Sequence, residues 1–274
     1  PTSPRGEKMA QRQDTPILQV EDAFLRSVHP GRSGSPPMWL FLDKRGVHFD
    51  HSHPSDLEVL LATHPLDDTA LLNRTRAASA RLIAENLSKY NTFDPNLQPP
   101  TAGYVLVIDQ TKGDASVKYA GADANTFREM LYYARDENPG ARIIVKTHPE
   151  TQAGHREGHF GPDIEDGKTV LYDAPVSPWA LMAGATKVYT VSSQLGFEAI
   201  YAGHKPVVFA RPFHAGWGLT DDRNPIDRRQ RSLTRAQLFA ATMILYAKWY
   251  DPFRDALCDI ETAIDNLTAE VRAY

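Results

Sequence analysis

The sequence predicts an α/β fold with two lobes, and three observations support this prediction. After residue 101, short apolar runs alternate with segments of helical periodicity, which is typical of a parallel sheet covered by helices. Before residue 93, only a few strand-like runs and one long helical pattern occur. The stretch 93–101 between them holds three prolines and predicts a linker. We therefore expect an abbreviated N-terminal lobe at 1–100 and a larger C-terminal lobe at 101–274.

The first lobe should contain few regular elements. The expected elements are, in chain order, a polar tail (1–15), a strand (17–20), a hairpin (39–42 with 47–49), a short helix capped by Ser55 and a long amphipathic helix (67–87). The first strand runs into two carboxylates, Glu21 and Asp22. Carboxylates that follow a strand directly often face a cleft, so Glu21 is a candidate for chemistry.

The second lobe should contain a parallel sheet of about five strands. The expected strands are 104–108, 143–145, 170–172, 188–191 and 207–209, and the expected helices between them are 126–135, 178–182 and 196–201. After Leu233, two helices broken at Pro252 should finish the chain and pack against the rest. Ligands of such sheets bind at the carboxyl ends of the strands, so the polar residues found there are the candidates for a site.

Composition excludes several classes of function. The chain of 274 residues is 42% hydrophobic and carries a net charge of −4, which suits a soluble protein and argues against nucleic acid as the main partner. No apolar run is long enough to span a membrane, and no signal-like segment occurs. The single cysteine, Cys258, forbids an internal disulfide and fits a reducing compartment. The densest basic cluster is Arg228, Arg229 and Arg231, interpreted as a solvated loop or as a face for an anionic substrate or membrane.

The segment from Ser192 to Phe213 predicts an anion site. Ser192 and Ser193 follow an apolar run at the point where a helix should begin, and the free N–H groups and the dipole of a helix start favour a phosphate. Glu198 would lie about one and a half turns into this helix, where it could reach a sugar hydroxyl. The pattern indicates a nucleotide-sugar site, although an N-cap followed by a core helix explains many such segments.

Two further strand ends carry chemically useful groups. Lys146 and His148 leave one strand together, and Pro149 fixes the turn that orients them, so they could hold a phosphate. The segment from Asp109 to Asp114 follows another strand and could supply a nucleophile, a base or a helix cap. With Glu21, such a carboxylate could form the pair that double displacement at a sugar carbon requires.

Other readings of the motifs are weaker. His48, Asp50, His51 and His53 alternate closely, but no fourth ligand at a recognisable spacing follows, so we predict no metal site. Neither serine at 192–193 lies in the motif of a serine hydrolase, and no glycine fingerprint or Walker loop occurs. No cofactor is expected.

Several ordered motifs resemble the KpsC family of capsule polysaccharide β-Kdo transferases. The matching segments are 20–27 (VEDAFLRS), 54–58 (PSDLE), 87–91 (LSKYN), 109–117 (DQTKGDASV), 145–149 (VKTHP), 193–199 (SQLGFEA) and 212–223 (PFHAGWGLTDDR). The resemblance covers most of the chain from about residue 17 onward. It implies a GT-B-like fold of two Rossmann-like lobes and a retaining glycosyltransferase that moves Kdo from CMP-β-Kdo to a glycan or glycolipid acceptor.

The resemblance also implies roles for individual residues. They are Asp114 as nucleophile, Gln110, which opens the same motif, as a further catalytic residue, Glu21 as general acid/base, Lys146, His148, Ser192 and Ser193 at the CMP phosphate, Glu198 at the ribose, and Arg26, Lys89 and Trp217 as acceptor or sugar contacts. Because cytidylate leaves already charged, fixed N–H groups and cations could stabilise it without a metal.

The resemblance implies a bacterial, cytoplasmic enzyme, associated peripherally with the inner face of the inner membrane if its acceptor is a lipid. Two positions depart from the family pattern, Ala23 in place of glycine and His214 in place of tyrosine. Family modules also carry further sheet-forming sequence before the carboxylate pair, so we expect the acceptor lobe to be short. The rival interpretations are a GT-B transferase for another nucleotide sugar and a nucleotide-binding module without catalysis.

Overall fold

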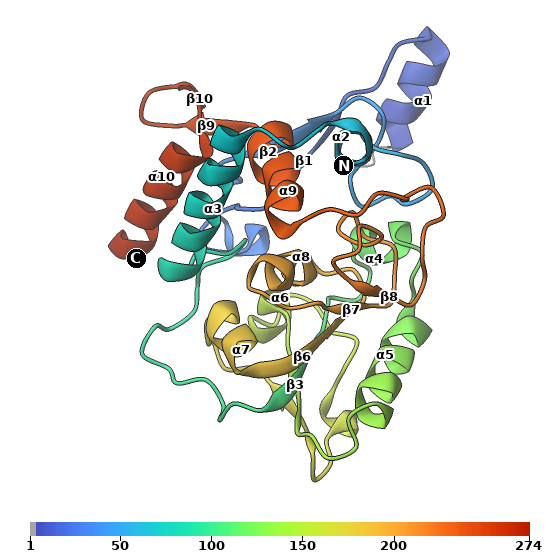
Figure 1. Cartoon of the computed structure of the whole chain (residues 1–274), viewed down its shortest axis with the longest axis vertical. Coiled ribbons are helices and arrows are strands. Elements are labelled where there is room, and N and C mark those ends of the chain that lie inside the picture. Colours follow the sequence, from blue (N-terminus) through green and yellow to red (C-terminus); the bar gives the residue numbers. More distant parts are fainter. Residues whose placement is uncertain (1–3) are drawn as a thin grey trace.

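The chain folds into two lobes that lie one above the other, with the parallel sheet in the lower lobe of Figure 1. The structure, a computed structural model, describes residues 4–274. The tail expected at 1–15 lies partly outside these residues. Its described part contradicts the prediction, because α1 (Pro4–Gln13) is a helix that projects from the body. Its residues include Arg, Lys, Met, Ala and Gln, which favour a helix even where no apolar period exists.

The lower lobe contains a six-stranded parallel sheet. In chain order its strands are β3 (Tyr104–Ile108), β4 (Ile143–Lys146), β5 (Thr169–Tyr172), β6 (Ala185–Thr190), β7 (Val207–Val208) and β8 (Asp221–Asp222). All five predicted strands are confirmed, and β8 was not predicted because two acidic residues give no strand pattern. The spatial order is β5-β4-β3-β6-β7-β8 and every pairing is parallel. The chain therefore winds to one side of β3 and then to the other, and reverses between β3 and β6, where such sheets bind ligands.

Helices cover both faces of this sheet and exclude solvent from it. Their bounds are α4 (Ala115–Tyr119), α5 (Ala124–Asp136), α6 (Pro149–Gln152), α7 (Pro178–Gly184) and α8 (Gln194–Tyr201), with a short 3₁₀ turn at Pro162–Ile164. Val105 and Val107 of β3 pack with Phe127 and Met130 of α5 on one face. Leu106, between the two valines, packs with the α7 side of the sheet. Alternate residues of β3 thus pack into the hydrophobic cores on opposite faces of the sheet, and for this reason the strand appears in the sequence as a continuous apolar run.

The upper lobe begins with β1 (Gln19–Asp22), a 3₁₀ turn (Gly31–Ser33), β2 (Leu40–Asp43), α2 (Asp56–Thr63) and α3 (Thr69–Ala84). The predicted hairpin is wrong: β2 pairs with β1, antiparallel, and 47–49 form no strand. The reason is a tight turn after β2, in which Asp43 accepts hydrogen bonds from the N–H groups of Arg45 and Gly46. The predicted cap at Ser55 is confirmed, because its Oγ accepts the N–H of Glu58 at 3.1 Å.

The C-terminal segment returns to the upper lobe. It comprises α9 (Arg235–Phe239), a π-helical stretch (Ala240–Tyr246), the hairpin β9 (Trp249–Asp251) with β10 (Ala256–Cys258), and α10 (Ile260–Ala273). Two helices with a break around Pro252 are as predicted, but they share one hydrophobic core with 23–87 rather than with the sheet. Figure 1 shows α10 beside α3. The placement of these helices in the second lobe is therefore corrected: Arg74 and Arg81 of α3 form ion pairs with Glu261 and Asp265 of α10.

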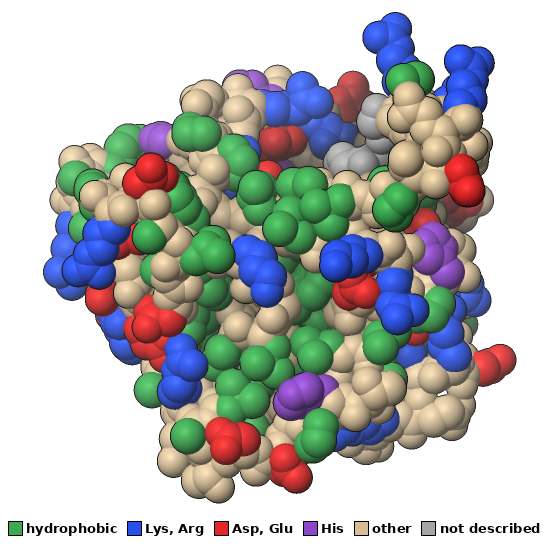
Figure 2. Space-filling view, turned by 90° about the horizontal axis from the view of Figure 1, so that it is seen from above, with side chains coloured by type: hydrophobic (Ala, Val, Ile, Leu, Met, Phe, Trp, Pro, Cys, Tyr) green, Lys and Arg blue, Asp and Glu red, His purple; other side chains and the backbone are tan. Residues whose placement is uncertain are grey.

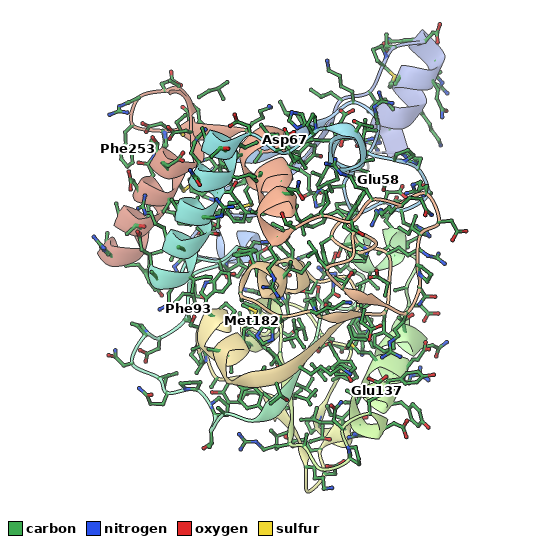
Figure 3. The ribbon with its side chains drawn as sticks, in the orientation of Figure 1. Glu58, Asp67, Phe93, Glu137, Met182 and Phe253 are labelled. Atoms are coloured by element: carbon green, nitrogen blue, oxygen red, sulfur yellow. The ribbon has the colours of Figure 1, made fainter. Side chains whose placement is uncertain are left out.

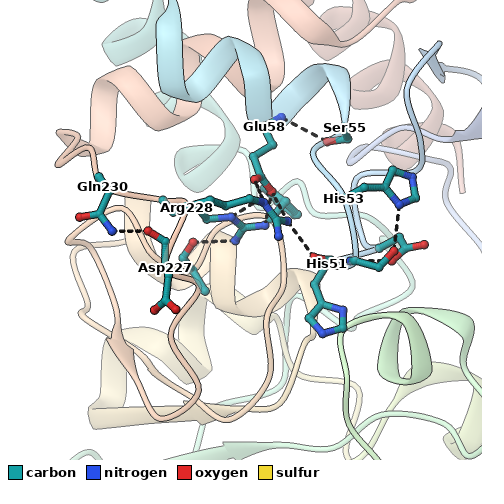
Figure 4. Close-up of polar contacts among 12 residues, drawn as sticks. His51, His53, Ser55, Glu58, Asp227, Arg228 and Gln230 are labelled. Atoms are coloured by element: carbon teal, nitrogen blue, oxygen red, sulfur yellow. Dashed lines mark hydrogen bonds and ion pairs between the residues drawn. The ribbon is translucent and has the colours of Figure 1, made fainter.

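A loop of the second lobe, 223–232, binds across to α2 (Figure 4). Glu58 accepts hydrogen bonds from the guanidinium groups of Arg228 and Arg229, and Arg229 is buried. Arg231 donates to the carbonyl oxygens of Leu61, His64 and Pro65. The basic cluster seen in the sequence is thus largely a structural tie between the lobes, and neither sequence-based interpretation of it holds for the buried Arg229.

In Figure 3, Phe93 lies where the predicted linker leaves the upper lobe. Glu137 lies on the side of the lower lobe that is remote from the upper lobe, and it is bound to Lys187, Tyr189 and Arg223.

Figure 2 shows hydrophobic side chains exposed among Lys and Arg on the upper face. The exposed apolar residues of the β1–β2 ribbon are Val20, Leu40 and Leu42. Among the described helices, none has the length and apolar character that crossing a bilayer requires.

Candidate functional site

A cavity of about 480 Å³ lies between the two lobes, at the carboxyl ends of the strands. Of the eleven residues predicted from the sequence, nine line this one cavity: Glu21, Lys89, Gln110, Asp114, Lys146, His148, Ser192, Ser193 and Glu198. The first two come from the upper lobe, Glu198 comes from α8, and the others lie at the end of β4 or in the segments that directly follow β3, β4 and β6. The structure thus brings together side chains that are up to 177 positions apart in the sequence, as the expected convergence of strand ends requires.

Gln110 and Ser192 join the ends of β3 and β6, where the strand order reverses. The Oε1 of Gln110 accepts the backbone N–H of Ser192 at 3.0 Å, and its Nε2 lies 3.1 Å from the Ser192 Oγ. Ser193 is the N-cap of α8, and its Oγ accepts the N–H of Leu195 at 3.2 Å. The first turn of α8 therefore points into the cavity with a helix dipole that favours an anion.

Lys146 and His148 line the cavity beside this helix start. Burial lowers the pKa of Lys146 to about 8, and the only hydrogen bond found for its Nζ within the described chain is to the carbonyl oxygen of the neighbouring Thr147. Burial, assisted by the charge of Lys89, lowers the pKa of His148 to about 4, so its imidazole is neutral. Its Nδ1 accepts the N–H of Glu150 at 3.1 Å, which leaves the proton on Nε2. Together they offer a cation and a neutral donor to a phosphate.

The two carboxylates predicted to react lie on different lobes. Glu21 belongs to β1, and desolvation by burial raises its pKa against the opposing effects of the Asp22 N–H and Lys89. Asp114 caps α4, and its Oδ1 accepts the N–H of Ser116 at 2.9 Å, which fixes the orientation of the carboxylate. A carboxyl with a raised pKa suits proton transfer, and a fixed carboxylate suits attack on a sugar carbon.

Glu198 is buried at 1% exposure and already has protein partners. Its carboxylate accepts the Ser88 hydroxyl at 2.8 Å and the Gln194 amide at 3.0 Å. Burial raises its pKa to about 7, despite these hydrogen bonds and the nearby Lys89. Glu198 therefore ties α8 to the 87–91 segment of the upper lobe, and its contact with a ribose stays a prediction.

Two predicted sugar contacts lie outside the cavity. Arg26 is buried at 6% exposure, and its guanidinium binds Asp22, Ser27 and the carbonyl oxygen of Ser35. Trp217 is fully buried in the core of the upper lobe, and its indole N–H donates to the carbonyl oxygen of Phe213. Their roles as ligand contacts are therefore corrected to structural ones: Arg26 orients the neighbour of Glu21, and Trp217 fills the core.

The histidine cluster after β2 does not converge. His48 points into an aromatic cage that includes Phe24, Phe41 and Phe213, whereas His51 binds the carbonyl oxygen of Tyr119 and the guanidinium of Arg211. Within residues 4–274, no group of three or more His, Cys, Asp or Glu side chains is arranged to hold a metal ion. Catalysis without a metal stays a prediction.

Some residues that line the cavity had no individual role predicted from the sequence. Asp109 is buried directly after β3, accepts the N–H groups of Gln110 and His159, and has its pKa raised to about 6 by burial. Arg32 reaches from the upper lobe to Glu150, with 3.8 Å between Nε and Oε2. The position of Asp109 after a predicted strand marked it as a possible acid. Arg32 lies in the short 3₁₀ turn Gly31–Ser33, which no pattern in the sequence indicated. Tyr90, next to Lys89, also lines the cavity.

The comparisons with known proteins agree with this geometry. Residues 1–249 match the family described as capsule polysaccharide biosynthesis protein. The chain belongs to this family. Its fold is similar to that of the Thermosulfurimonas dismutans KpsC β-Kdo 2,4 transferase, with a TM-score of 0.90, 36% identity, and coverage of 96% of this chain and 83% of that one. The predicted α/β, GT-B-like fold and the resemblance to KpsC are confirmed.

Other proteins similar to this chain are either more distant in sequence or longer. The KpsC β-Kdo 2,7 transferase of the same organism matches with a TM-score of 0.73 at 24% identity, over 98% of this chain and 90% of that one, and so shares the fold. The capsule polysaccharide modification protein LipA of Neisseria meningitidis serogroup A is 35% identical over 99% of this chain. The lipopolysaccharide-processing protein LpsZ of Rhizobium meliloti is 37% identical over 95%. The chain spans 40% of the length of LipA and 60% of that of LpsZ.

Proposed function

We propose that the protein is a retaining glycosyltransferase that moves Kdo from CMP-β-Kdo to a glycan or glycolipid acceptor in capsule polysaccharide synthesis. One observation carries the proposal: the anion-binding groups of the lower lobe and two carboxylates on opposite lobes line the same cavity. The family and its solved relative with a TM-score of 0.90 support the sugar. Because that relative is a β-Kdo 2,4 transferase, we propose a β-2,4 linkage in the product.

The donor phosphate is assigned to the point where the strand order reverses. Lys146 supplies the cation, His148 supplies a neutral N–H, and the start of α8 supplies its helix dipole together with the hydroxyls of Ser192 and Ser193. Gln110 holds Ser192 in place. These groups stabilise the charge of the departing cytidylate, which therefore needs neither a proton nor a metal in our proposal. The ribose is assigned to the region of Glu198.

The transfer follows double displacement. The Asp114 carboxylate attacks the anomeric carbon of Kdo, the bond from that carbon to the phosphate oxygen breaks, and CMP leaves with the electron pair. In the second step, the Glu21 carboxylate takes the proton of the acceptor hydroxyl, the acceptor oxygen attacks the anomeric carbon, and the bond to Asp114 breaks. Two inversions give net retention. The raised pKa of Glu21 makes it a stronger base for this step.

The acceptor chemistry also suggests where the protein works. A glycan or glycolipid of the capsule is made at the cytoplasmic side of the inner membrane in our proposal, and the exposed apolar side chains of the β1–β2 ribbon are compatible with peripheral contact there.

The test is a transfer assay with CMP-Kdo generated in situ and a panel of Kdo-terminated acceptors, with the product linkage read by NMR. We expect a β-linked Kdo product, lost on Asp114→Ala and on Glu21→Gln, while CMP affinity changes by less than about threefold because neither residue binds the phosphate. Intact mass should detect a Kdo adduct on the protein that Asp114→Ala lacks. Thermal shifts that favour UMP or GDP over CMP would instead indicate another nucleotide-sugar donor. CMP binding with no transfer to any acceptor would indicate a module without catalysis.

A further inference from the structure

Lys89 is a cation in the cavity whose ammonium group forms no direct ion pair with residues 4–274. It belongs to the 87–91 segment that follows α3, lines the cavity and is partly buried. Among the residues that the structure describes, no hydrogen bond and no ion pair is found for its ammonium group, and the Tyr90 ring lies 5.6 Å from its Nζ. Leaving an ammonium ion partly out of water without a partner is unfavourable, so its position calls for an anion that the ligand brings.

Lys89 lies near the two carboxylates that are proposed to react, Asp114 and Glu21. Burial lowers the pKa of Lys89, but Coulombic interactions with Tyr90 and with the carboxyl groups of Asp114, Glu21 and Asp22 together outweigh burial and raise it, so the ammonium group is protonated at neutral pH. Lys89 in turn lowers the pKa of Glu21. The ammonium group therefore lies within electrostatic range of both the proposed nucleophile and the proposed base.

The backbone around Lys89 is fixed by both lobes. Ser88 donates its N–H to Asn91 and its hydroxyl to Glu198 of α8, and the carbonyl oxygen of Lys89 accepts the N–H of Ser27. Asn91 donates to the carbonyl oxygens of Ser27 and Ser88. A segment held at this many points presents the side chain from a defined position, which is what recognition of a small charged group requires.

The chemistry of the proposed donor supplies the missing anion. Kdo is a 2-ulosonic acid, so its carboxylate is bonded to the anomeric carbon, the atom that Asp114 attacks. That carboxylate must then approach Asp114 and Glu21, and three negative groups in one partly dry space repel one another. Lys146 cannot relieve this repulsion if it binds the phosphate, as proposed, at the end of β4.

We propose that Lys89 binds the carboxylate of the sugar and makes the enzyme selective for 2-ulosonic acids over neutral sugars. This inference rests on the proposed function and deepens it, because it separates the two charges of the donor between two lysines. Lys146 receives the phosphate, and Lys89 receives the carboxylate. The pair also explains why the cavity holds cations on both lobes.

The test compares Lys89→Met, Lys89→Arg and the control Lys118→Met, in which the lysine changed lies on α4, outside the cavity lining. Binding of CMP alone and, with CMP present, of free Kdo, N-acetylneuraminate and the methyl ester of Kdo is measured by calorimetry, and transfer from CMP-Kdo is measured separately. For Lys89→Met we expect unchanged CMP affinity, binding of the two free acids weakened about 10- to 100-fold, and unchanged binding of the ester. Lys89→Arg should restore part of the acid binding, and Lys118→Met should match the wild type.

The outcomes separate this inference from the proposed function. Transfer of Kdo by the wild type, together with equal loss of acid and ester binding in Lys89→Met, would overturn the role of Lys89 and leave the function standing. Weaker CMP binding in Lys89→Met would also overturn it, because it would place the lysine at the phosphate. Wild-type protein that binds CMP but neither binds nor transfers Kdo would contradict the function, and the inference with it. Selective loss of acid binding, with folding confirmed by an unchanged melting temperature, supports the inference.

Discussion

The amide of Gln110 bridges β3 to β6, because its Oε1 accepts the backbone N–H of Ser192 at 3.0 Å. The two residues are 82 positions apart and follow the two strands between which the chain reverses direction across the sheet. The bridge orients the first residue of the proposed phosphate site without occupying it. Gln110 thus acts through Ser192 in our interpretation, as a positioning residue.

Replacement of Gln110 should therefore weaken CMP binding. Gln110→Ala removes the acceptor for the Ser192 N–H and the donor to its Oγ, at a cost of about 1 to 3 kcal/mol for the buried groups left unpaired. We expect CMP affinity to fall about tenfold by calorimetry and the melting temperature to fall as well. Gln230→Ala is the control, since Gln230 is exposed and its side chain donates to the carbonyl oxygen of Asp227 in its own loop. Equal affinities in both variants would argue against the bridge.

His148 should contribute to CMP binding equally across neutral and mildly acidic pH. Its pKa of about 4 keeps the ring neutral from pH 5.5 to 8, so its N–H donates to the phosphate without adding charge. We expect His148→Ala to lose about tenfold in CMP affinity, and the ratio of wild-type to variant affinity to stay constant over this range. A ratio that grows as the pH falls through 6.5 would mean that the imidazole gains a proton, contrary to the structure.

Glu198 should make the wild type less stable at alkaline than at acidic pH. Its pKa is about 7 in the folded chain against 4.5 in the unfolded chain, so the folded state holds the extra proton between these values. The stability that this proton provides is complete below about pH 4.5 and is lost as the pH rises through 7. Glu198→Gln keeps a neutral side chain at all pH values. As the pH rises from 5 to 8, the free energy of unfolding of Glu198→Gln, measured with urea, should rise by about 2 to 3 kcal/mol relative to that of the wild type. A difference that is independent of pH would place the carboxyl in contact with solvent.

The tie between Glu58 and Arg229 should matter more for stability than any surface ion pair. Glu58→Gln leaves the buried guanidinium of Arg229 without its carboxylate, and such a loss typically costs about 3 to 5 kcal/mol. Glu261→Gln, which breaks the more exposed pair with Arg74, should cost less than about 1 kcal/mol. Denaturant unfolding of both variants at pH 7 measures the difference. If both variants lose a similar amount of free energy of unfolding, the buried pair of Glu58 and Arg229 contributes no more to stability than the exposed pair.

Much of the lower lobe could be predicted because its signals are local. Apolar runs such as Tyr104–Ile108 are buried on both faces and therefore show as continuous hydrophobic stretches, and the polar residues after them mark the strand ends. Once the sheet is parallel, those ends must share one edge, so the convergence of Gln110, Lys146 and Ser192 followed from the pattern. The roles of Arg26 and Trp217 could not be predicted in this way. An arginine and a tryptophan in a matching motif look the same whether they face a ligand or a core.

The upper lobe shows most clearly what could not be predicted from the sequence. The pairing of β2 with β1 instead of 47–49 depends on a turn that Asp43 organises, and the packing of α10 on α3 joins residues more than 180 positions apart. The periodicity of the sequence predicts neither the strand pairing nor the helix packing. The apolar pattern of a helix indicates that one of its faces is covered, but it does not indicate which segment covers it.

The sequence by itself determined the elements of the sheet, the polar groups at its strand ends and the family to which they belong, since these depend on the order and spacing of neighbouring residues. Only the tertiary structure decided that Glu21 and Lys89 of the upper lobe face those groups across one cavity, and that the C-terminal helices support the upper lobe. The physical reason is that contacts between distant segments depend on the summed packing of whole faces, which is a property of the folded chain.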